Sequence, residues 1–283
     1  MIDLLIASAD TQGQASIVEL TEGDLAIAAF LVLLLALLSF RLRLGISTRI
    51  IVAASRTVVQ LVLIGFLLRI LFQTENLLWI TLIATVMLAV AGYEVMQRQH
   101  HRFYGWWGFG MGSIAMFVSS FTITVFALNV IVHVDPWYSP QYAIPLLGMM
   151  LGNTMNGIAI GLDRLTRLMW TQRGMIENRL MLGERACDAV AGIKRECIRS
   201  GMIPIINAMA VAGVVSLPGM MTGQILSGTE PMTAVKYQIL IMFLITAGTG
   251  FGTWIAISFG SRHMFDERQR LCLDRLKINE DEH

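Results

Sequence analysis

Seven long apolar stretches dominate this chain and limit what it can fold into. They cover residues 24–40, 50–72, 77–96, 106–132, 141–163, 202–226 and 236–260. A helix needs about 20 mainly apolar residues to cross the hydrocarbon core of a bilayer, and the stretches have that length. Only 14% of the residues are charged, against about a quarter in average soluble domains. The sequence therefore predicts an all-α polytopic membrane protein with seven transmembrane helices.

The basic residues indicate how the helices are oriented. Of the 21 Lys and Arg residues, all but Arg56, Arg69 and Lys236 lie in four segments, namely 41–49, 97–105, 164–201 and the tail from 261. The alternate connections contain none. Because Lys and Arg accumulate in cytoplasmic connections, we expect the N-terminus outside and the C-terminus in the cytoplasm.

This orientation predicts three regions. Residues 1–23 form an extracytoplasmic N-terminal segment, 24–260 a transmembrane permease domain, and 261–283 a cytoplasmic tail. The expected location is the cell inner (plasma) membrane, as a multi-pass protein. A seven-helix retinal protein is disfavoured, since its lysine lies near the middle of the last span, whereas Lys236 stands at the outer end.

The largest polar segment, 164–201, belongs to the permease domain and is expected in the cytoplasm. Its residues Ile176, Leu180, Gly183, Cys187 and Val190 recur three or four apart, which is helical spacing. One interpretation is an amphipathic helix lying on the membrane surface. The other is a docking surface for a cytoplasmic partner.

The run ENRLMLG at 177–183, followed by Ile193, favours docking. It resembles the coupling motif EAA-x3-G-x9-I of bacterial ABC importer permeases. We expect Glu177, Leu182, Gly183 and Ile193 to couple the chain to an ATPase. No phosphate-binding G-x-x-x-x-G-K-[ST] run occurs in the sequence, so ATP hydrolysis is expected on a separate chain. This chain is not expected to be an enzyme or to need a cofactor.

Three runs resemble the FetB-type family of ABC transporter permeases: SRTVVQL at 55–61, LGNTMNGIAIGLDR at 151–164 and VSLPGMMTGQIL at 215–226. The last also resembles plant aluminium-tolerance membrane proteins. The resemblance covers roughly residues 45–260. It implies a permease that pairs with a cytoplasmic ABC ATPase, iron export in bacterial members, and aluminium or nucleotide-sugar handling in plant members.

The fifth span carries polar groups at helical spacing. Asn153, Asn156 and Asp163 form one stripe with Met149 and Ile160. The pairs Gly148/Gly152 and Gly157/Gly161 lie on the opposite side, where small residues allow helices to approach closely. The two asparagines either bond to neighbouring helices or line a substrate pathway.

The second and third spans also contain candidate pathway residues. Arg56 and Gln60 are four apart on one face of the second span, and Glu94 lies at a similar depth in the third. We hypothesise that Arg56 pairs with Glu94, although Arg56 could also extend to the cytoplasmic surface.

The sixth span is expected to be broken. Pro204 suits its first turn, because the first turn needs no amide donor there. Asn207 follows, and Pro218-Gly219 should interrupt the helix before Met220, Met221 and Gln224. Interrupted helices often mark transport sites. The alternative is an outer cap that never contacts substrate.

These observations predict the permease subunit of an ABC transporter, with metal (iron) export as the leading function. The alternatives are an ABC permease for a nucleotide sugar or other small solute, a secondary transporter that needs no ATPase, and a membrane sensor. The expected partners are a cytoplasmic ABC ATPase, a second copy of the chain in a homodimer, and the lipid bilayer, with no nucleic acid. No metal site is identified, since the three cysteines lack metal-ligand spacing and most of the 18 methionines suit packing.

Overall fold

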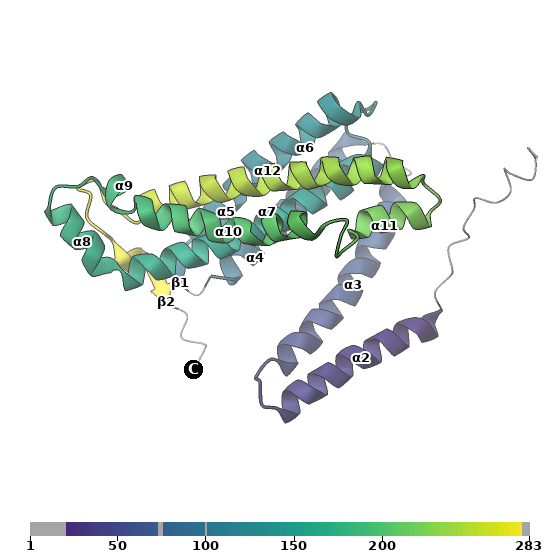
Figure 1. The fold of residues 1–283 in the computed structure, drawn as a ribbon, viewed down its shortest axis with the longest axis horizontal. Helices are drawn as coiled ribbons and strands as arrows, with labels where there is room; N and C mark the ends of the chain where they lie inside the picture. Colours follow the sequence, from purple (N-terminus) through teal and green to yellow (C-terminus); the bar gives the residue numbers. More distant parts are fainter. Residues whose placement is uncertain (1–20, 73–75, 100, 279–283) are drawn as a thin grey trace, which may run out of the picture. The chain divides into compact units, whose positions relative to one another are not determined.

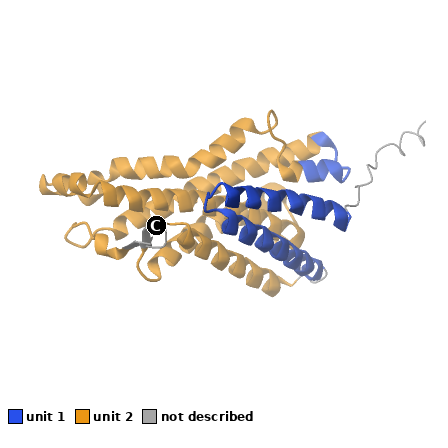
Figure 2. Ribbon diagram, turned by 90° about the horizontal axis from the view of Figure 1, so that it is seen from below, with its two compact units in different colours: residues 1–75, 222–231 blue, residues 76–221, 232–283 orange. Residues whose placement is uncertain are grey.

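A computed structural model describes residues 21–72, 76–99 and 101–278, and these are almost entirely helical (Figure 1). The chain divides into two compact units, shown in Figure 2. Unit 1 comprises residues 1–75 and 222–231, and unit 2 comprises residues 76–221 and 232–283.

Unit 1 is built on a helical hairpin of α2 (Glu22–Arg41) and α3 (Ser47–Leu71). A capping box starts α2, in which the Asp24 carboxylate accepts the Thr21 amide at 2.9 Å and the Thr21 hydroxyl accepts the Asp24 amide at 3.4 Å. Such reciprocal bonds satisfy amides that would otherwise lack partners at a helix start. The turn between the helices uses positive φ at Arg43 and Gly45.

Unit 2 contains most of the remaining helices. In chain order they are α4 (Leu77–Gln97), a fourth helical stretch over Trp107–Val132, α7 (Pro140–Thr171), α8 (Arg173–Met181), α9 (Ala186–Ala189), α10 (Ala191–Val211) and α12 (Pro231–His263). The short α11 (Gly219–Leu226) passes from unit 2 into unit 1. The fourth stretch alternates α5 (Trp107–Met116), π-helical η1 (Phe117–Phe121), α6 (Thr122–Phe126) and π-helical η2 (Ala127–Val132).

Six helical stretches among the described residues are long and apolar enough to cross a membrane. They correspond to the predicted spans one to five and seven. The predicted sixth span is divided between α10 and α11. A chain that is helical apart from two short strands, with several helices able to cross a membrane, is therefore confirmed. A seventh crossing and the orientation of the termini stay predictions.

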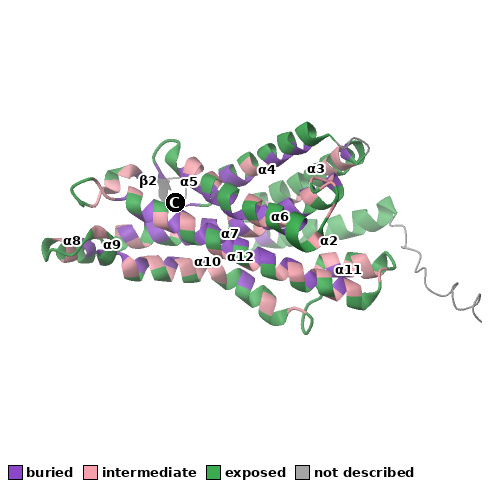
Figure 3. Ribbon diagram, turned by 90° about the horizontal axis from the view of Figure 1, so that it is seen from above, coloured by how far each residue is buried: buried purple, intermediate pink, exposed green. Residues whose placement is uncertain are grey.

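Helix α7 is the centre of unit 2, and buried residues concentrate along it and its neighbours (Figure 3). Leu151, Ile158, Leu162 and Leu165 on α7 are 3% exposed or less. A Cβ added at Gly157 would lie 2.6 Å from Thr249 of α12 and 3.1 Å from the backbone oxygen of Gly201 on α10.

The close contacts confirm one of the two predicted small-residue pairs. A Cβ at Gly161 would lie 2.8 Å from Ile257 of α12, so both Gly157 and Gly161 are needed for close approach. In the other pair, a Cβ at Gly152 meets nothing within 4 Å and one at Gly148 meets only the flexible end of Met87.

The expected sixth span needs two corrections. Because α10 begins at Ala191, Pro204 lies inside the helix and not in its first turn. The break also comes earlier than Pro218, since α10 ends at Val211 and the chain turns at Gly213, which has φ +80°. Pro218 then precedes the first residue of α11, where its missing N–H removes no helical bond.

The periodicity of segment 164–201 suggested an amphipathic helix, but the segment is not one continuous helix. Helix α7 runs on to Thr171, and α8 stops at Met181. The amides of Gly183 and Glu184 bond to the carbonyls of Leu180 and Arg179 at 3.0 and 3.1 Å. Together with φ +90° at Gly183, these bonds form a Schellman motif that ends the helix.

The C-terminal tail is partly structured, which the sequence did not predict. Strand β2 (Leu276–Ile278) pairs antiparallel with β1 (His101–Phe103), and the single turn η3 (Leu273–Arg275) precedes it. Met264 and Phe103 are buried, at 0% and 3% exposed. The tail therefore packs on unit 2 as far as residue 278.

Candidate functional site

A groove of about 490 Å³ opens between α4, α7 and α10 within unit 2. Its lining combines charged and apolar side chains from the three helices: Arg98, Asn156, Ala159, Ile160, Asp163, Arg164, Arg167, Ser200 and Pro204. The α7 residues of this set continue the polar stripe recognised in the sequence, because they recur at helical spacing.

Asn156 connects α7 to α4 at one part of the groove. Its Oδ1 accepts a hydrogen bond from Nη1 of Arg98 at 2.5 Å. Nε of Arg98 also lies 3.9 Å from a carboxylate oxygen of Glu94, one turn earlier on α4. Asn156 therefore makes the interhelical bond that was one of its two predicted roles, and it also lines the groove.

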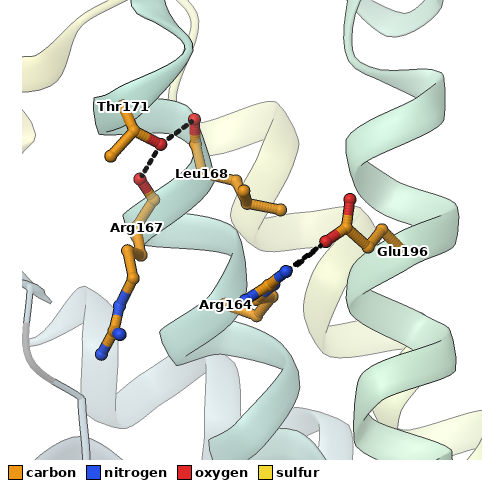
Figure 4. Close-up of polar contacts among 5 residues, drawn as sticks. All are labelled: Arg164, Arg167, Leu168, Thr171 and Glu196. Atoms are coloured by element: carbon orange, nitrogen blue, oxygen red, sulfur yellow. Dashed lines mark hydrogen bonds and ion pairs between the residues drawn. The ribbon is translucent and has the colours of Figure 1, made fainter.

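An ion pair joins α7 to α10 beside the groove, as drawn in Figure 4. Nη2 and Nε of Arg164 donate to Oε1 of Glu196 at 2.5 and 3.1 Å. On the same helix, Nη2 of Arg167 lies 3.3 Å from the Asp163 carboxylate. The three arginine side chains are 46 to 53% exposed, so they remain accessible from the groove.

Pro204 lies inside α10, where it removes one backbone hydrogen bond of the helix beside the groove. Pro204 has no N–H, so the carbonyl of Ser200 receives no bond from the residue four positions later. Both residues line the groove.

Other predicted pathway residues lie elsewhere. Asn153 donates to the Met149 carbonyl of its own helix at 2.8 Å, and Asn207 is exposed on α10. Met221 is 8% exposed, and Met220 packs against the apolar cluster around Met150. Both methionines are therefore packed, and their role in a substrate pathway stays a prediction.

The residues of unit 1 are described separately. Arg56 and Gln60 are exposed on α3, and Gln224 lies on the part of α11 that belongs to unit 1. The proposed pair of Arg56 with Glu94 joins different units and stays a prediction.

Two of the four predicted coupling residues line a second groove of about 750 Å³. Glu177 and Gly183 line it on one side, and residues 267–271 of the tail line the other. The side chain of Gln269 accepts the Ala186 amide at 2.9 Å, which ties the tail to the turn after α8. Leu182 is 84% exposed, whereas Ile193 is 4% exposed. Ile193 is therefore a core residue and does not line the groove.

The sequence interpretation missed the arginines of the first groove and the whole tail side of the second. Arg167 lies four residues after Asp163 and so continues the polar stripe on α7. The helical spacing could therefore have identified this arginine. Nothing in the pattern indicated that residues 267–271 lie against α8. Within the described parts of the chain, no three His, Cys, Asp or Glu side chains gather in a way that could hold a metal ion.

Comparison with known proteins gives a family match over most of the chain. The family described as "Uncharacterised protein family (UPF0014)" matches residues 23–265. A UPF0014 membrane protein of Synechocystis sp. is 36% identical over 233 residues, which cover 81% of this chain and 88% of the relative. No solved structure matches.

Two further relatives carry more specific names. "Protein ALUMINUM SENSITIVE 3" of Arabidopsis thaliana is 34% identical over 217 residues, 77% of each chain. "Probable iron export permease protein FetB" of Escherichia coli is 28% identical over 263 residues, which cover 91% of this chain and 97% of the relative.

Proposed function

The chain belongs to the UPF0014 family of membrane proteins, and from this premise we propose that it is the permease subunit of an ABC transporter. A separate cytoplasmic ATPase drives it, and the leading cargo is iron, moved outward. The name of the E. coli relative supports this cargo, since the similarity extends over nearly the full length of both chains.

The observation that carries the proposal is the exposed turn after α8. Met181 and Leu182 are 77% and 84% exposed at the helix end, and Gly183 fixes the turn that presents them. In a segment that is expected outside the membrane, two adjacent large apolar side chains this exposed suit a surface that another protein covers. In the proposed transporter, the ATPase holds this turn and moves α7 and α10, which flank it in the chain.

The proposed assembly contains two permease chains and two ATPase subunits, because an ABC transporter needs two permease units and this chain supplies one. Each permease crosses the cell inner membrane seven times, with α10 and α11 together forming the sixth crossing. The N-terminus is outside, and the turn after α8 faces the cytoplasm, where nucleotide is available.

A second candidate cargo is an anionic small solute such as a nucleotide sugar. The specific observation is the groove between α4, α7 and α10, where three arginines meet one carboxylate. The guanidinium groups offer N–H donors to a phosphate or carboxylate, and they have no lone pair that could bind a metal cation. Among the described residues, the lack of a metal-binding cluster agrees with this alternative.

The test is a coupling assay on the reconstituted permease and its ATPase. Leu182→Glu should abolish cargo-dependent ATP hydrolysis and transport, because it places a charge on the docking surface. Leu42→Glu is the matched control, since Leu42 is 60% exposed in the connection between α2 and α3, away from the assigned docking surface. Transport of iron, other metals and nucleotide sugars into vesicles identifies the cargo.

Unchanged coupling in Leu182→Glu would refute the assigned surface. Transport that needs no ATPase would instead identify a secondary transporter.

A further inference from the structure

The groove between α4, α7 and α10 has the composition of an anion site. Its lining contains the guanidinium groups of Arg98, Arg164 and Arg167 and a single carboxylate, that of Asp163. We propose that this groove binds a phosphate group. The proposal rests on the second candidate cargo described above and deepens it, but binding at the groove does not require an ATPase, so its test is separate from a transport assay.

The arginines keep donors available for a ligand. A guanidinium has five N–H donors in a planar fork that matches phosphate oxygens. Arg167 places one nitrogen near Asp163, and Arg98 donates through one nitrogen to Asn156. Each contact uses only part of the fork, so the remaining N–H groups can donate into the groove.

The acidic partners hold the arginines in position. Arg164 bonds to Glu196 on the next helix, and Arg98 lies near Glu94 on its own helix. Neither glutamate lines the groove. Their carboxylates therefore orient the guanidinium groups from outside the ligand space, which reduces the entropy lost when a ligand binds.

Neutral groups complete the site. Asn156 lines the groove; its Oδ1 accepts from Arg98, and its Nδ2 amide brings two more N–H donors to the site. Ala159, Ile160 and Pro204 supply an apolar wall. From Asn156 to Arg167 the groove follows α7 for roughly 16 Å at the helical rise per residue.

That length suits a phosphate ester whose apolar or ring-bearing part lies along the wall. Such a group comes either from the headgroup of an anionic phospholipid or from a soluble phosphate ester. Basic pockets between transmembrane helices on the cytoplasmic side are known to bind lipid headgroups. Both sources present the same phosphate oxygens to the arginines.

The experiment has two arms, with the full chain purified in each. In the first, binding of pyrophosphate is measured by equilibrium dialysis in a neutral detergent. In the second, native mass spectrometry counts retained lipid after reconstitution in phosphatidylcholine, with and without phosphatidylglycerol. The variants are Arg98→Gln and Arg167→Gln, with Arg199→Gln as the control because Arg199 is exposed on α10 outside the groove lining.

Loss of one charge-assisted contact should weaken binding about tenfold in Arg98→Gln and Arg167→Gln and leave Arg199→Gln unchanged. Arg167→Lys keeps the charge and should retain part of the affinity, which separates ligand binding from a folding defect. Pyrophosphate binding identifies a soluble source, and selective retention of phosphatidylglycerol identifies the lipid. The proposal is overturned if wild type binds neither probe, or if Arg199→Gln loses as much binding as Arg167→Gln.

Discussion

The contact between Gly157 of α7 and Gly201 of α10 provides the sharpest test of how unit 2 packs. A Cβ at residue 201 would lie 2.5 Å from the backbone oxygen of Gly157 and 2.8 Å from the Thr253 methyl group. A backbone oxygen in a helix cannot rotate away, so Gly201→Ala must separate the two helices. Overpacking of this kind costs about 1–3 kcal/mol.

Gly192→Ala is the matched control on the same helix, because a Cβ there meets nothing within 4 Å. Both changes gain up to about 1 kcal/mol of helix propensity, so this contribution cancels in the comparison. Gly201→Ala should therefore be about 1–3 kcal/mol less stable than Gly192→Ala.

Thermal unfolding of the detergent-solubilised variants measures this difference. At roughly 2–4 °C per kcal/mol for chains approaching this size, the midpoint of Gly201→Ala should fall about 2–12 °C below that of Gly192→Ala. Equal midpoints, both at or above wild type, would show that the helices do not approach as closely as described.

Three further predictions concern the turn after α8, the C-terminal tail and the ion pair between α7 and α10. Gly183→Ala places a residue with a side chain in the left-handed backbone region, at a cost of about 1–2 kcal/mol. Hydrogen exchange of the Glu184 amide should therefore become faster. Unchanged exchange at this amide would exclude the Schellman motif. Hydrogen bonds from the backbone and side chain of Arg270 lower the pKa of Asp266, so the ionised carboxylate stabilises the turn from Asp266 to Arg270 above the usual Asp pKa. As the pH falls through the lowered pKa, the amides of this turn should lose their protection from hydrogen exchange. Asp266→Asn should show no such pH-dependent step. A double-mutant cycle on Arg164 and Glu196 should give a coupling free energy below about 1 kcal/mol, because both side chains are nearly half exposed. A larger coupling free energy would contradict this exposure and indicate that water is excluded from the ion pair.

The sequence predicted the membrane helices well because long apolar stretches carry a strong signal. Six of the expected spans are helices of suitable length. The glycines at 157 and 161 were also recognised as packing residues, since their spacing places them on one helix face. The sequence did not show where α10 begins, because its first ten residues include four charged side chains and lack the composition of a span.

The candidate site was predicted only in part. Asn156 was identified because an amide in an apolar stretch is conspicuous, whereas Arg98, Arg164 and Arg167 look like ordinary basic residues of a cytoplasmic connection. Their convergence depends on three helices meeting, which is a tertiary property. The pairing of Gln269 with the turn after α8 joins residues 83 positions apart, and no local pattern encodes that distance.

The π-helical turns of the fourth helical stretch have a consequence for scanning experiments. Each π turn accommodates one extra residue, which rotates the following side chains by about 100° relative to a regular α-helix. With η1 at Phe117–Phe121 and η2 at Ala127–Val132, a helical wheel drawn through the whole stretch assigns the wrong lipid-facing edge beyond residue 121. In a scan of single-cysteine variants along this stretch, the labelled positions should follow helical spacing, with the labelled face shifting once after η1 and once after η2.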